Sequence, residues 1–182
     1  MDLSADLTGK TVAIVAVDHV EDAELTTPRD ALRKAGAEVR IYSPDGGAIQ
    51  AVEGDTEPTQ KIDADGAFDD IDPEAVDALV VPGGTVNADK LRVDQAAQTL
   101  VRQVAGAGKP VAVICHGPWL LVSAGLVDGR RLTSYHSLAE DIKNAGGVWV
   151  DEEVVVDHNL ITSRNPGDLD AFVGALADAL AS

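Results

Sequence analysis

The sequence predicts an α/β fold in which a mostly parallel central sheet carries helices on both faces. Strand-like and helix-like segments alternate along the chain, which is the pattern of a doubly wound sheet. Hydrophobic residues make up 45% of the 182 residues and aromatic residues only 3%, so Val, Ala, Leu and Ile must build the core, as in buried parallel sheets. Because this length suits one sizeable core, we expect a single domain over residues 1–182.

The first part of the chain begins with a polar segment, residues 1–10, which we expect to be a loose lead-in. The β-branched run 11–17 predicts a central strand. Acidic residues then open a predicted helix over 21–34, which ends on basic residues and a glycine, as the helix dipole favours. A second strand is expected over 37–43. The acidic stretch 48–72 is interrupted by glycine and proline and predicts short strands or loops at the edge of the sheet.

The middle of the chain contains two further predicted strands, each followed by a turn. The apolar run 77–81 ends in a Pro-Gly-Gly sequence, and we expect a loop over 82–89 where backbone can approach a ligand closely. A helix is predicted over 94–107 and ends before a glycine. The strand 109–114 then leads into a short helix over 118–124.

The last part of the chain is expected to combine short strands with two helices. A helix over 137–145 has Ser137 as its expected N-cap, with Glu140 three residues later. A final helix over 166–180 has Ala and Leu at helical spacing. Short apolar runs predict strands at 131–133, 148–150, 154–157 and 160–162.

The charge and the single cysteine exclude several classes of protein. Thirty-one acidic against 14 basic residues give a net charge of −17, which repels nucleic-acid phosphates and anionic membranes, so we expect neither as a partner. The single cysteine excludes an internal disulfide, and neither a signal peptide nor a spanning run of ~20 apolar residues is visible. We therefore expect a cytoplasmic protein. His19 and His158 lack ligand-like spacing and the glycines lack a nucleotide-binding pattern, so no metal or cofactor is expected.

Cys115 is the most informative residue of the sequence. The strand ending at Ile114 stops at this cysteine, and His116-Gly-Pro118 follows at once. We interpret the stretch as a sharp strand-to-helix turn that lifts the thiol clear of the sheet, where free N–H groups of the next helix are expected to lower its pKa. A lone cysteine among Val and Ile is more often an inert buried residue. Its position beside a potential base, His116, favours a nucleophile.

Three loops are expected to meet at the carboxyl ends of the strands, where doubly wound sheets bind ligands. They are 18–24, 82–89 and 115–118. In the first, Glu24 can help a thiolate only as the neutral acid that donates a hydrogen bond to the sulfur. The alternative is an exposed glutamate at the start of a helix.

The second loop supplies an acid and a backbone donor. Asp89 is the candidate carboxylate for holding the ring of His116, in a Cys-His-acid triad; the alternative is a solvated charge at a helix start. The backbone N–H groups of Gly84 and His116 are candidates for an oxyanion hole, and the alternative is a plain turn.

Five segments together resemble the PfpI (intracellular protease I) family, within the parkinsonism-associated deglycase and class I glutamine amidotransferase-like superfamily. They are Glu21-Asp-Ala-Glu-Leu25, Asp77-Ala-Leu-Val-Val-Pro-Gly-Gly84, Gly108-Lys-Pro-Val-Ala-Val-Ile-Cys-His-Gly-Pro118, Thr133-Ser-Tyr135 and Ser163-Arg164. The resemblance implies a flavodoxin-like sandwich with Cys115 as the nucleophile at a nucleophile elbow, His116 after it and Glu24 as a protonated carboxyl touching the sulfur. It also implies a homo-oligomer, a dimer or a hexamer.

In that oligomer, the resemblance implies that the third member of the triad comes from a neighbouring subunit. The matching acid here is Asp89, where the protease itself has a glutamate, so its reach is one methylene shorter. The loop that carries it also looks one residue longer than in the archaeal protease. The downstream His-x-Glu of the amidotransferases is missing, so glutamine hydrolysis is not expected.

The resemblance leaves the substrate open, because family members have been assigned protease, glyoxalase and deglycase activities. Others act in stress responses with a readily oxidised cysteine. Our hypothesis is a stress-response protein with a cysteine-dependent hydrolase or lyase site that needs no cofactor and acts on peptides or on reactive-carbonyl (glyoxal-type) adducts. The alternative is a redox-responsive protein whose Cys115 is oxidised without turnover. A holdase chaperone is disfavoured by the low aromatic content and the high charge.

Overall fold

A seven-stranded sheet forms the centre of the molecule. In the computed structural model, which describes residues 3–182, its strands are β1 (Thr11–Val15), β3 (Glu38–Ser43), β6 (Gly66–Ala67), β7 (Ala78–Val81), β8 (Val111–Ile114), β11 (Val154–Asp157) and β12 (Leu160–Ser163). They lie in the order β11-β12-β8-β7-β1-β3-β6, and β11 alone in this sheet pairs antiparallel to its neighbour. The predicted mostly parallel sheet is confirmed.

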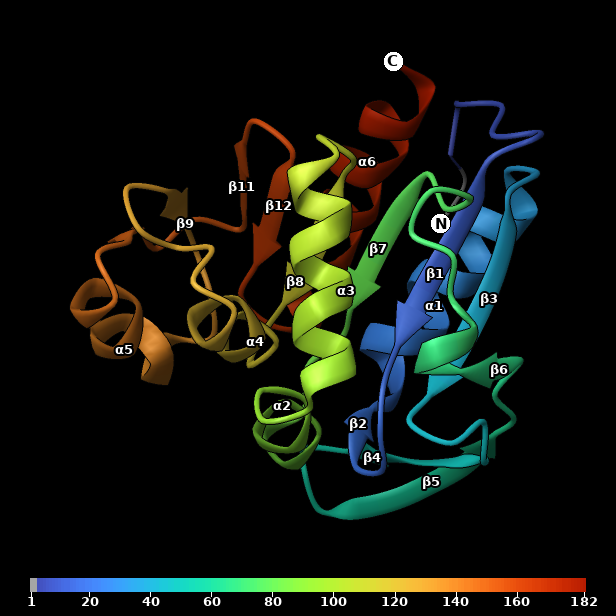
Figure 1. Cartoon of the computed structure of the whole chain (residues 1–182), viewed down its shortest axis with the longest axis horizontal. Coiled ribbons are helices and arrows are strands. Elements are labelled where there is room, and N and C mark those ends of the chain that lie inside the picture. The colour runs from blue at the N-terminus through green and yellow to red at the C-terminus, as the bar shows by residue number, and fades with distance from the viewer. Residues whose placement is uncertain (1–2) are drawn as a thin grey trace.

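Helices cover both faces of this sheet (Figure 1). The helices are α1 (Asp22–Lys34), α2 (Thr85–Leu91), α3 (Gln95–Gly106), α4 (Pro118–Ser123), α5 (Ala139–Asn144) and α6 (Leu169–Ala181). Successive strand residues point to opposite faces, so Ile14 packs with the apolar sides of α1 and α6, and Val15 packs with those of α3, α4 and α5. The two hydrophobic clusters make the helix-sheet-helix sandwich that the sequence predicts.

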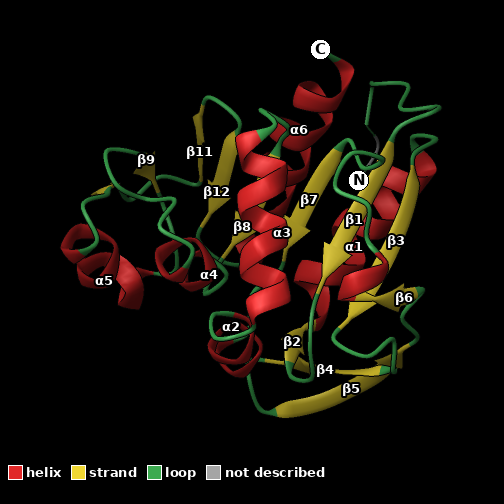
Figure 2. Ribbon diagram, in the orientation of Figure 1, coloured by secondary structure: helices red, strands yellow, loops and turns green. Residues whose placement is uncertain are grey.

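A small second sheet lies across the carboxyl ends of the central strands (Figure 2). It consists of β2 (Val20–Glu21), β4 (Ile49–Glu53) and β5 (Glu57–Ile62), with β4 and β5 forming an antiparallel hairpin. We expected residues 48–72 at the edge of the central sheet, but only β6 pairs there. The hairpin takes its other position because Ile49 and Ile62 are buried in the cluster beneath α1.

The strands expected over 131–133 and 148–150 form as β9 (Arg131–Leu132) and β10 (Val148–Trp149), which pair with each other. Three other sequence-based expectations about local structure are wrong. Residues 82–89 are not one loop, because α2 begins at Thr85. Ser137 lies inside a 3₁₀ turn over 136–138, and α5 starts after it with Leu138 at the N-cap. Residues 3–10 of the predicted loose segment are not loose, since Leu7 is fully buried and its N–H donates to the carbonyl of Ala35 at 2.8 Å, and residues 1–2 lie outside the described part of the chain.

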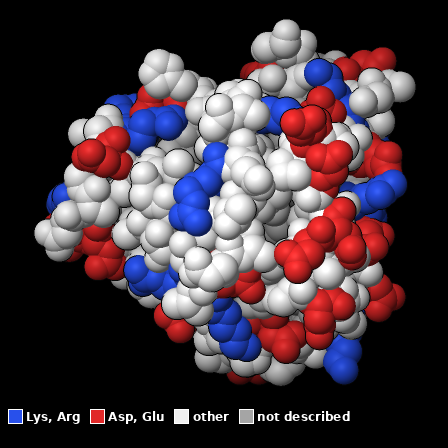
Figure 3. All heavy atoms as spheres, viewed as in Figure 1, with Lys and Arg blue, Asp and Glu red and all other residues white. Residues whose placement is uncertain are grey.

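Charge is distributed unevenly over the surface. Figure 3 shows acidic side chains gathered over β3 and β6 and few charges over α3. Across residues 3–182, no helix combines the length and the apolar character that crossing a membrane requires.

Candidate active site

Cys115 sits at a strained turn directly after β8. Its φ of +62° is in the left-handed region, which costs a residue with a side chain roughly 1–2 kcal/mol. Two backbone hydrogen bonds hold it there: its N–H donates to the carbonyl of Ser163 at 3.0 Å, and its carbonyl accepts from the N–H of Tyr135 at 2.8 Å. A β-carbon at Gly117 would lie 2.7 Å from Cγ1 of Val113, so the chain can turn this tightly only with glycine there. The predicted sharp turn is confirmed.

The three segments 18–24, 82–89 and 115–118 meet at Cys115, although the first contains β2 and the start of α1, and the second contains the start of α2. The N–H of Gly83 donates to Oε2 of Glu24 at 2.7 Å, and the N–H of Glu21 donates to the carbonyl of Gly83 at 3.3 Å. A β-carbon at Gly83 would lie 2.6 Å from Cβ of Cys115 and would also overlap Oε2 of Glu24. Glu24 is therefore packed between the glycine loop and the thiol, and it is fully buried rather than exposed at a helix start.

Burial changes the acidity of both groups. It raises the pKa of Glu24 from 4.5 to about 8, against the opposing hydrogen bonds from Gly83 and Cys115, so the carboxyl holds its proton at neutral pH. Burial, followed by the Glu24 carboxyl, also raises the pKa of the Cys115 thiol above its ordinary value. The sequence predicted a lowered thiol pKa from the next helix. That expectation is wrong, because α4 is only six residues long and desolvation outweighs it.

Two backbone donors oppose this effect of burial on the thiol. The N–H groups of Gly84 and His116 form hydrogen bonds that favour the thiolate of Cys115 and so lower its pKa. The sequence analysis named the same two N–H groups as candidates for an oxyanion hole, and that role stays a prediction. Gly84 has a φ of +90°, and a β-carbon there would overlap the carbonyl oxygen of His19. Glycine at this position lets the backbone N–H reach the sulfur.

The ring of His116 lies against the thiol and is buried, with 6% of the residue exposed. Its Nδ1 is 3.2 Å from Sγ of Cys115. Its Nε2 is 3.3 Å from Oγ1 of Thr85 and 3.4 Å from Oγ of Ser137. Burial lowers the pKa of His116, Asp55 raises it and His136 lowers it further. The pKa of the ring is thus below its ordinary value, which favours the neutral imidazole. The two ring nitrogens face different groups.

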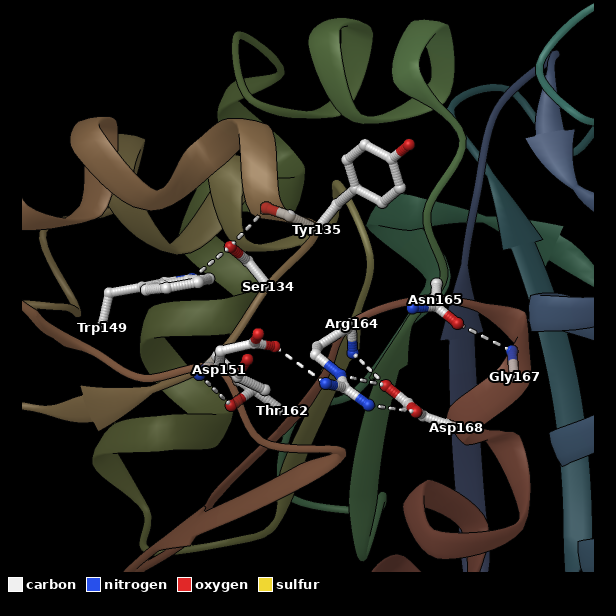
Figure 4. Close-up of polar contacts among 10 residues, drawn as sticks. Ser134, Tyr135, Trp149, Asp151, Thr162, Arg164, Asn165, Gly167 and Asp168 are labelled. Carbon is white, nitrogen blue, oxygen red and sulfur yellow. Dashed lines mark hydrogen bonds and ion pairs between the residues drawn. The ribbon is translucent and has the colours of Figure 1, made fainter.

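Two aromatic rings enclose His116. Tyr135 stacks on it with ring centroids 4.6 Å apart, and Trp119 meets it edge-on at 5.6 Å. Figure 4 shows how the loop that carries Tyr135 is held: Nε1 of Trp149 donates to Oγ of Ser134 at 2.9 Å, and this hydroxyl donates to the carbonyl of Tyr135 at 2.8 Å. The ring of Tyr135 points away from that cluster.

An ion-pair cluster supports the neighbouring strand end. Arg164, the residue after β12, contacts Asp168 through Nε at 2.9 Å and Asp151 through Nη1 at 2.8 Å (Figure 4). Asp168 is buried and Arg164 is its cationic partner. Because the preceding Ser163 accepts the hydrogen bond from the N–H of Cys115, this cluster fixes one wall of the site.

Asp89 does not reach His116 within the chain. It lies on the exposed surface of α2, and its carboxylate makes no hydrogen bond within residues 3–182. The groups at Nε2 of His116 are instead Thr85 and Ser137. Reasoning from the sequence assigned no role to Thr85 or to Asp55, which accepts hydrogen bonds from Thr85. Local sequence patterns could not predict the contact between Ser137 and His116 either, because the two residues are 21 positions apart.

The arrangement has the parts that attack on a carbonyl requires. A thiol, a neighbouring imidazole, a protonated buried carboxyl and two backbone N–H groups converge on one point. Within the described part of the chain, no three His, Cys, Asp or Glu side chains are grouped as a metal site would need.

Comparison with known proteins places the chain among relatives of similar length. Residues 10–179 match the DJ-1/PfpI family. The chain is 41% identical over 162 residues to Deglycase PfpI of Pyrococcus furiosus, covering 89% of this chain and 94% of that protein. It is 43% identical over 165 residues to Protein/nucleic acid deglycase 2 of Escherichia coli, covering 90% and 93%. It is 39% identical over 165 residues to General stress protein 18 of Bacillus subtilis, covering 90% and 94%.

Solved structures have the same fold. Drosophila melanogaster DJ-1beta superposes with a TM-score of 0.86 at 30% identity, covering 94% of this chain and 90% of that one. A protein of Anabaena variabilis that contains DJ-1/ThiJ/PfpI-like and ferritin-like domains superposes with a TM-score of 0.88 at 36% identity, covering 94% of this chain. This chain spans 48% of that two-domain protein.

Proposed function

The chain belongs to the DJ-1/PfpI family, and from this membership we propose that it is a stress-response enzyme with a cysteine-dependent hydrolase or lyase site. The proposed substrates are reactive-carbonyl (glyoxal-type) adducts. The observation that carries the proposal is the position of Cys115: its sulfur lies at a strained turn, 3.2 Å from Nδ1 of His116 and beside the buried carboxyl of Glu24.

The first chemical step is a proton transfer coupled to attack. Nδ1 of His116 takes the thiol proton while Sγ of Cys115 bonds to the carbonyl carbon of the adduct. The carbonyl π electrons move to oxygen, and the N–H groups of Gly84 and His116 stabilise the resulting oxyanion. His116 then returns the proton to this oxyanion, which leaves a neutral hemithioacetal or hemithioketal bonded to Cys115. Glu24 stays protonated throughout, so that it adds no negative charge beside the sulfur.

The enclosure of the site favours small adducts over peptides. Cys115 and His116 each expose only 6% of their surface, and two aromatic rings flank the imidazole. An adduct on a flexible side chain or on a small thiol reaches such a sulfur more readily than a polypeptide backbone does. Relatives with deglycase in their names support the same substrate class.

The test is turnover of methylglyoxal, of its thiol adducts and of peptide amides by the wild type, Cys115→Ala and Cys115→Ser. We expect the wild type alone to consume methylglyoxal or its adducts, with no cleavage of peptide amides. Circular dichroism checks that both variants keep the fold. Equal rates for wild type and Cys115→Ala would remove the proposal, and exclusive peptide cleavage would replace its substrate.

A second candidate function is redox sensing, and one observation favours it. Oε1 of Glu24 is fully buried without a hydrogen-bond partner. Peroxide would convert the thiol of Cys115 to sulfenic acid with release of water, and the protonated Glu24 can donate a hydrogen bond to the added oxygen. Intact-mass spectra after mild peroxide treatment test this: a gain of one or two oxygens on wild type but not on Cys115→Ser supports it. An unmodified Cys115 argues against a sensor.

We also propose that the chain forms a homo-oligomer in which Asp89 lies at an interface. Asp89 is exposed and unbonded within the described chain, and Val93, one turn further along, is 70% exposed. An exposed valine beside an unpaired acid suits a surface that another copy covers. Light scattering on the wild type and on Val93→Asp tests the assembly. A wild-type mass of a single chain would contradict it.

A further inference from the structure

Within the site just proposed, and resting on that proposed function, a second carboxylate lies close enough to act on His116. We propose that Asp55, acting through the hydroxyl of Thr85, is the positioning residue that sets the tautomer of His116 within one chain. Asp55 thereby takes, in the same subunit, the role that the family resemblance assigns to an acid of a neighbouring subunit.

The β4–β5 hairpin delivers Asp55 to the site in a fixed conformation. Asp55 has a φ of +67°, which an aspartate tolerates better than most residues. The carboxylate of Glu21, itself only 9% exposed, accepts hydrogen bonds from the N–H groups of Gly54 at 3.2 Å and Asp55 at 3.4 Å. The hairpin turn is thus anchored to Glu21, the residue that precedes α1, and the first turn of α1 carries Glu24.

Asp55 holds the first residue of α2 with both of its oxygens. Its Oδ1 accepts from the N–H of Thr85 at 2.6 Å, and its Oδ2 accepts from Oγ1 of Thr85 at 2.9 Å. Two bonds to one residue fix the direction of the Thr85 side chain. Its hydroxyl is then aimed between the carboxylate and Nε2 of His116, which is 3.3 Å away.

The single hydroxyl proton of Thr85 decides which nitrogen of His116 is protonated. A carboxylate can only accept, so the hydroxyl gives its proton to Asp55 and has only lone pairs left for the ring. Nε2 must therefore carry the ring proton and donate it to Oγ1 of Thr85. In this neutral tautomer Nδ1 has a free lone pair, and it faces Sγ of Cys115 at 3.2 Å.

This arrangement prepares His116 for the proton transfer of the first step. The S–H bond of Cys115 breaks, its electron pair stays on sulfur, and the proton bonds to Nδ1. The ring becomes an imidazolium that keeps its Nε2 proton on Thr85 and faces the negative charge of Asp55 through it. No other group gains or loses a proton.

The remaining groups around the ring do not supply this effect. Burial and the neighbouring His136 both lower the pKa of His116, whereas Asp55 raises it. Ser137 faces Nε2 at 3.4 Å, but it is exposed and its hydroxyl has no carboxylate to fix it. Tyr135 stacks on the ring face and does not contact a ring nitrogen in the plane. Glu24 accepts from the N–H of Gly83 and makes no hydrogen bond to the ring within residues 3–182.

The experiment measures the tautomer directly, together with the pH profile of Cys115 alkylation by iodoacetamide. ¹⁵N imidazole shifts show which nitrogen carries the proton, with the His116 signals assigned by their loss in His116→Gln. In Asp55→Asn, the side-chain amide can donate to Oγ1, which turns the hydroxyl proton toward Nε2 and favours protonation of Nδ1. Thr85→Val removes the relay, and Thr85→Ser retains it.

We expect wild type and Thr85→Ser to carry the neutral-ring proton on Nε2. Asp55→Asn should shift it toward Nδ1, lower the pKa of the ring and slow alkylation at neutral pH roughly tenfold or more; Thr85→Val should slow alkylation similarly. Asp72→Asn is the matched control, because Asp72 lies in the loop before β7, at the opposite end of the strands. Within residues 3–182 its carboxylate accepts a hydrogen bond only from the N–H of Glu74.

Three outcomes overturn the inference: an Nδ1 proton in the wild type, unchanged tautomer and alkylation in both Asp55→Asn and Thr85→Val, or the same changes in Asp89→Asn or Ser137→Ala instead. None of these readouts needs turnover. A failure of the proposed function, seen as equal turnover by wild type and Cys115→Ala, is therefore distinguishable from a failure of this inference.

Discussion

Replacing Glu24 by glutamine should change how the stability of the protein depends on pH. The carboxyl is fully buried and its pKa is raised to about 8 from an ordinary value of 4.5. Glutamine has nearly the same shape, keeps an oxygen for the N–H of Gly83 and cannot ionise. The comparison therefore isolates the proton that Glu24 holds in the folded state.

The size and sign of the effect follow from linkage. A folded-state pKa above the unfolded value gives stability that is complete below about pH 4.5 and is lost at about 1.4 kcal/mol per pH unit until about pH 8. Between about pH 5 and about pH 7.5, the wild type should lose about 3 kcal/mol relative to Glu24→Gln.

Urea unfolding at these two pH values, followed by the fluorescence of Trp119 and Trp149, measures this difference. Glu153→Gln removes one exposed carboxyl from the turn before β11 and is the matched control, which should show no such pH dependence. A wild-type-to-variant difference that changes by less than about 1 kcal/mol across the range would show that Glu24 is not held protonated by the fold.

Three further predictions concern the packing and the charge of the site. Gly83→Ala should destabilise the protein by about 1–3 kcal/mol, because the added β-carbon would overlap the Glu24 carboxyl. Gly174→Ala in α6 should stabilise it by about 0.5–1 kcal/mol, because a β-carbon there meets nothing within 4 Å. Thermal unfolding measures both effects. Arg164→Ala should cost about 2–4 kcal/mol in urea unfolding, since it leaves Asp168 buried without its cation. Turnover should fall above about pH 8 as Glu24 ionises beside the sulfur, and a pH–rate profile of Glu24→Gln should lack that fall.

The central sheet could be predicted because its strands carry their signal locally. Residues 154–157 were expected as a strand and form β11 with those bounds, and the acidic start and basic end of α1 were equally clear. Helix α2 could not be predicted from its own residues. Its Thr-Val-Asn start has low helix propensity, and it is held by tertiary contacts: Oδ1 of Asn87 accepts from the N–H of Val17, and its Nδ2 donates to the carbonyl of Pro82.

The site divides in the same way. The sequence was enough to predict that Cys115 and His116 lie beside the glycine loop, because the carboxyl ends of neighbouring parallel strands meet at one edge of the sheet. Asp55 and Thr85 are 30 residues apart, and Thr85 and His116 are 31 apart. No motif connects them. The β4–β5 hairpin brings Asp55 over the strand ends, and that position depends on the burial of Ile49 and Ile62 rather than on any feature of the Asp55 turn itself.

The two carboxyl groups of the site differ in their protonation state and in the residue that they face. This difference bears on whether Cys115 is a thiol or a thiolate before substrate binds. Glu24 keeps its proton and faces the sulfur, while both oxygens of Asp55 accept hydrogen bonds and face the imidazole through Thr85. Because burial raises the pKa of Cys115, the thiol keeps its proton until a substrate carbonyl arrives to take the negative charge.

The measurement of stability against pH described for Glu24→Gln also tests the protonation state of Cys115. A thiolate already formed at rest would release its proton on folding and offset the slope due to Glu24, so Cys115→Ala would then show a steeper loss of stability with pH than the wild type. Equal slopes in the two proteins mean that the thiol is protonated at rest and that His116 takes its proton only in the reaction.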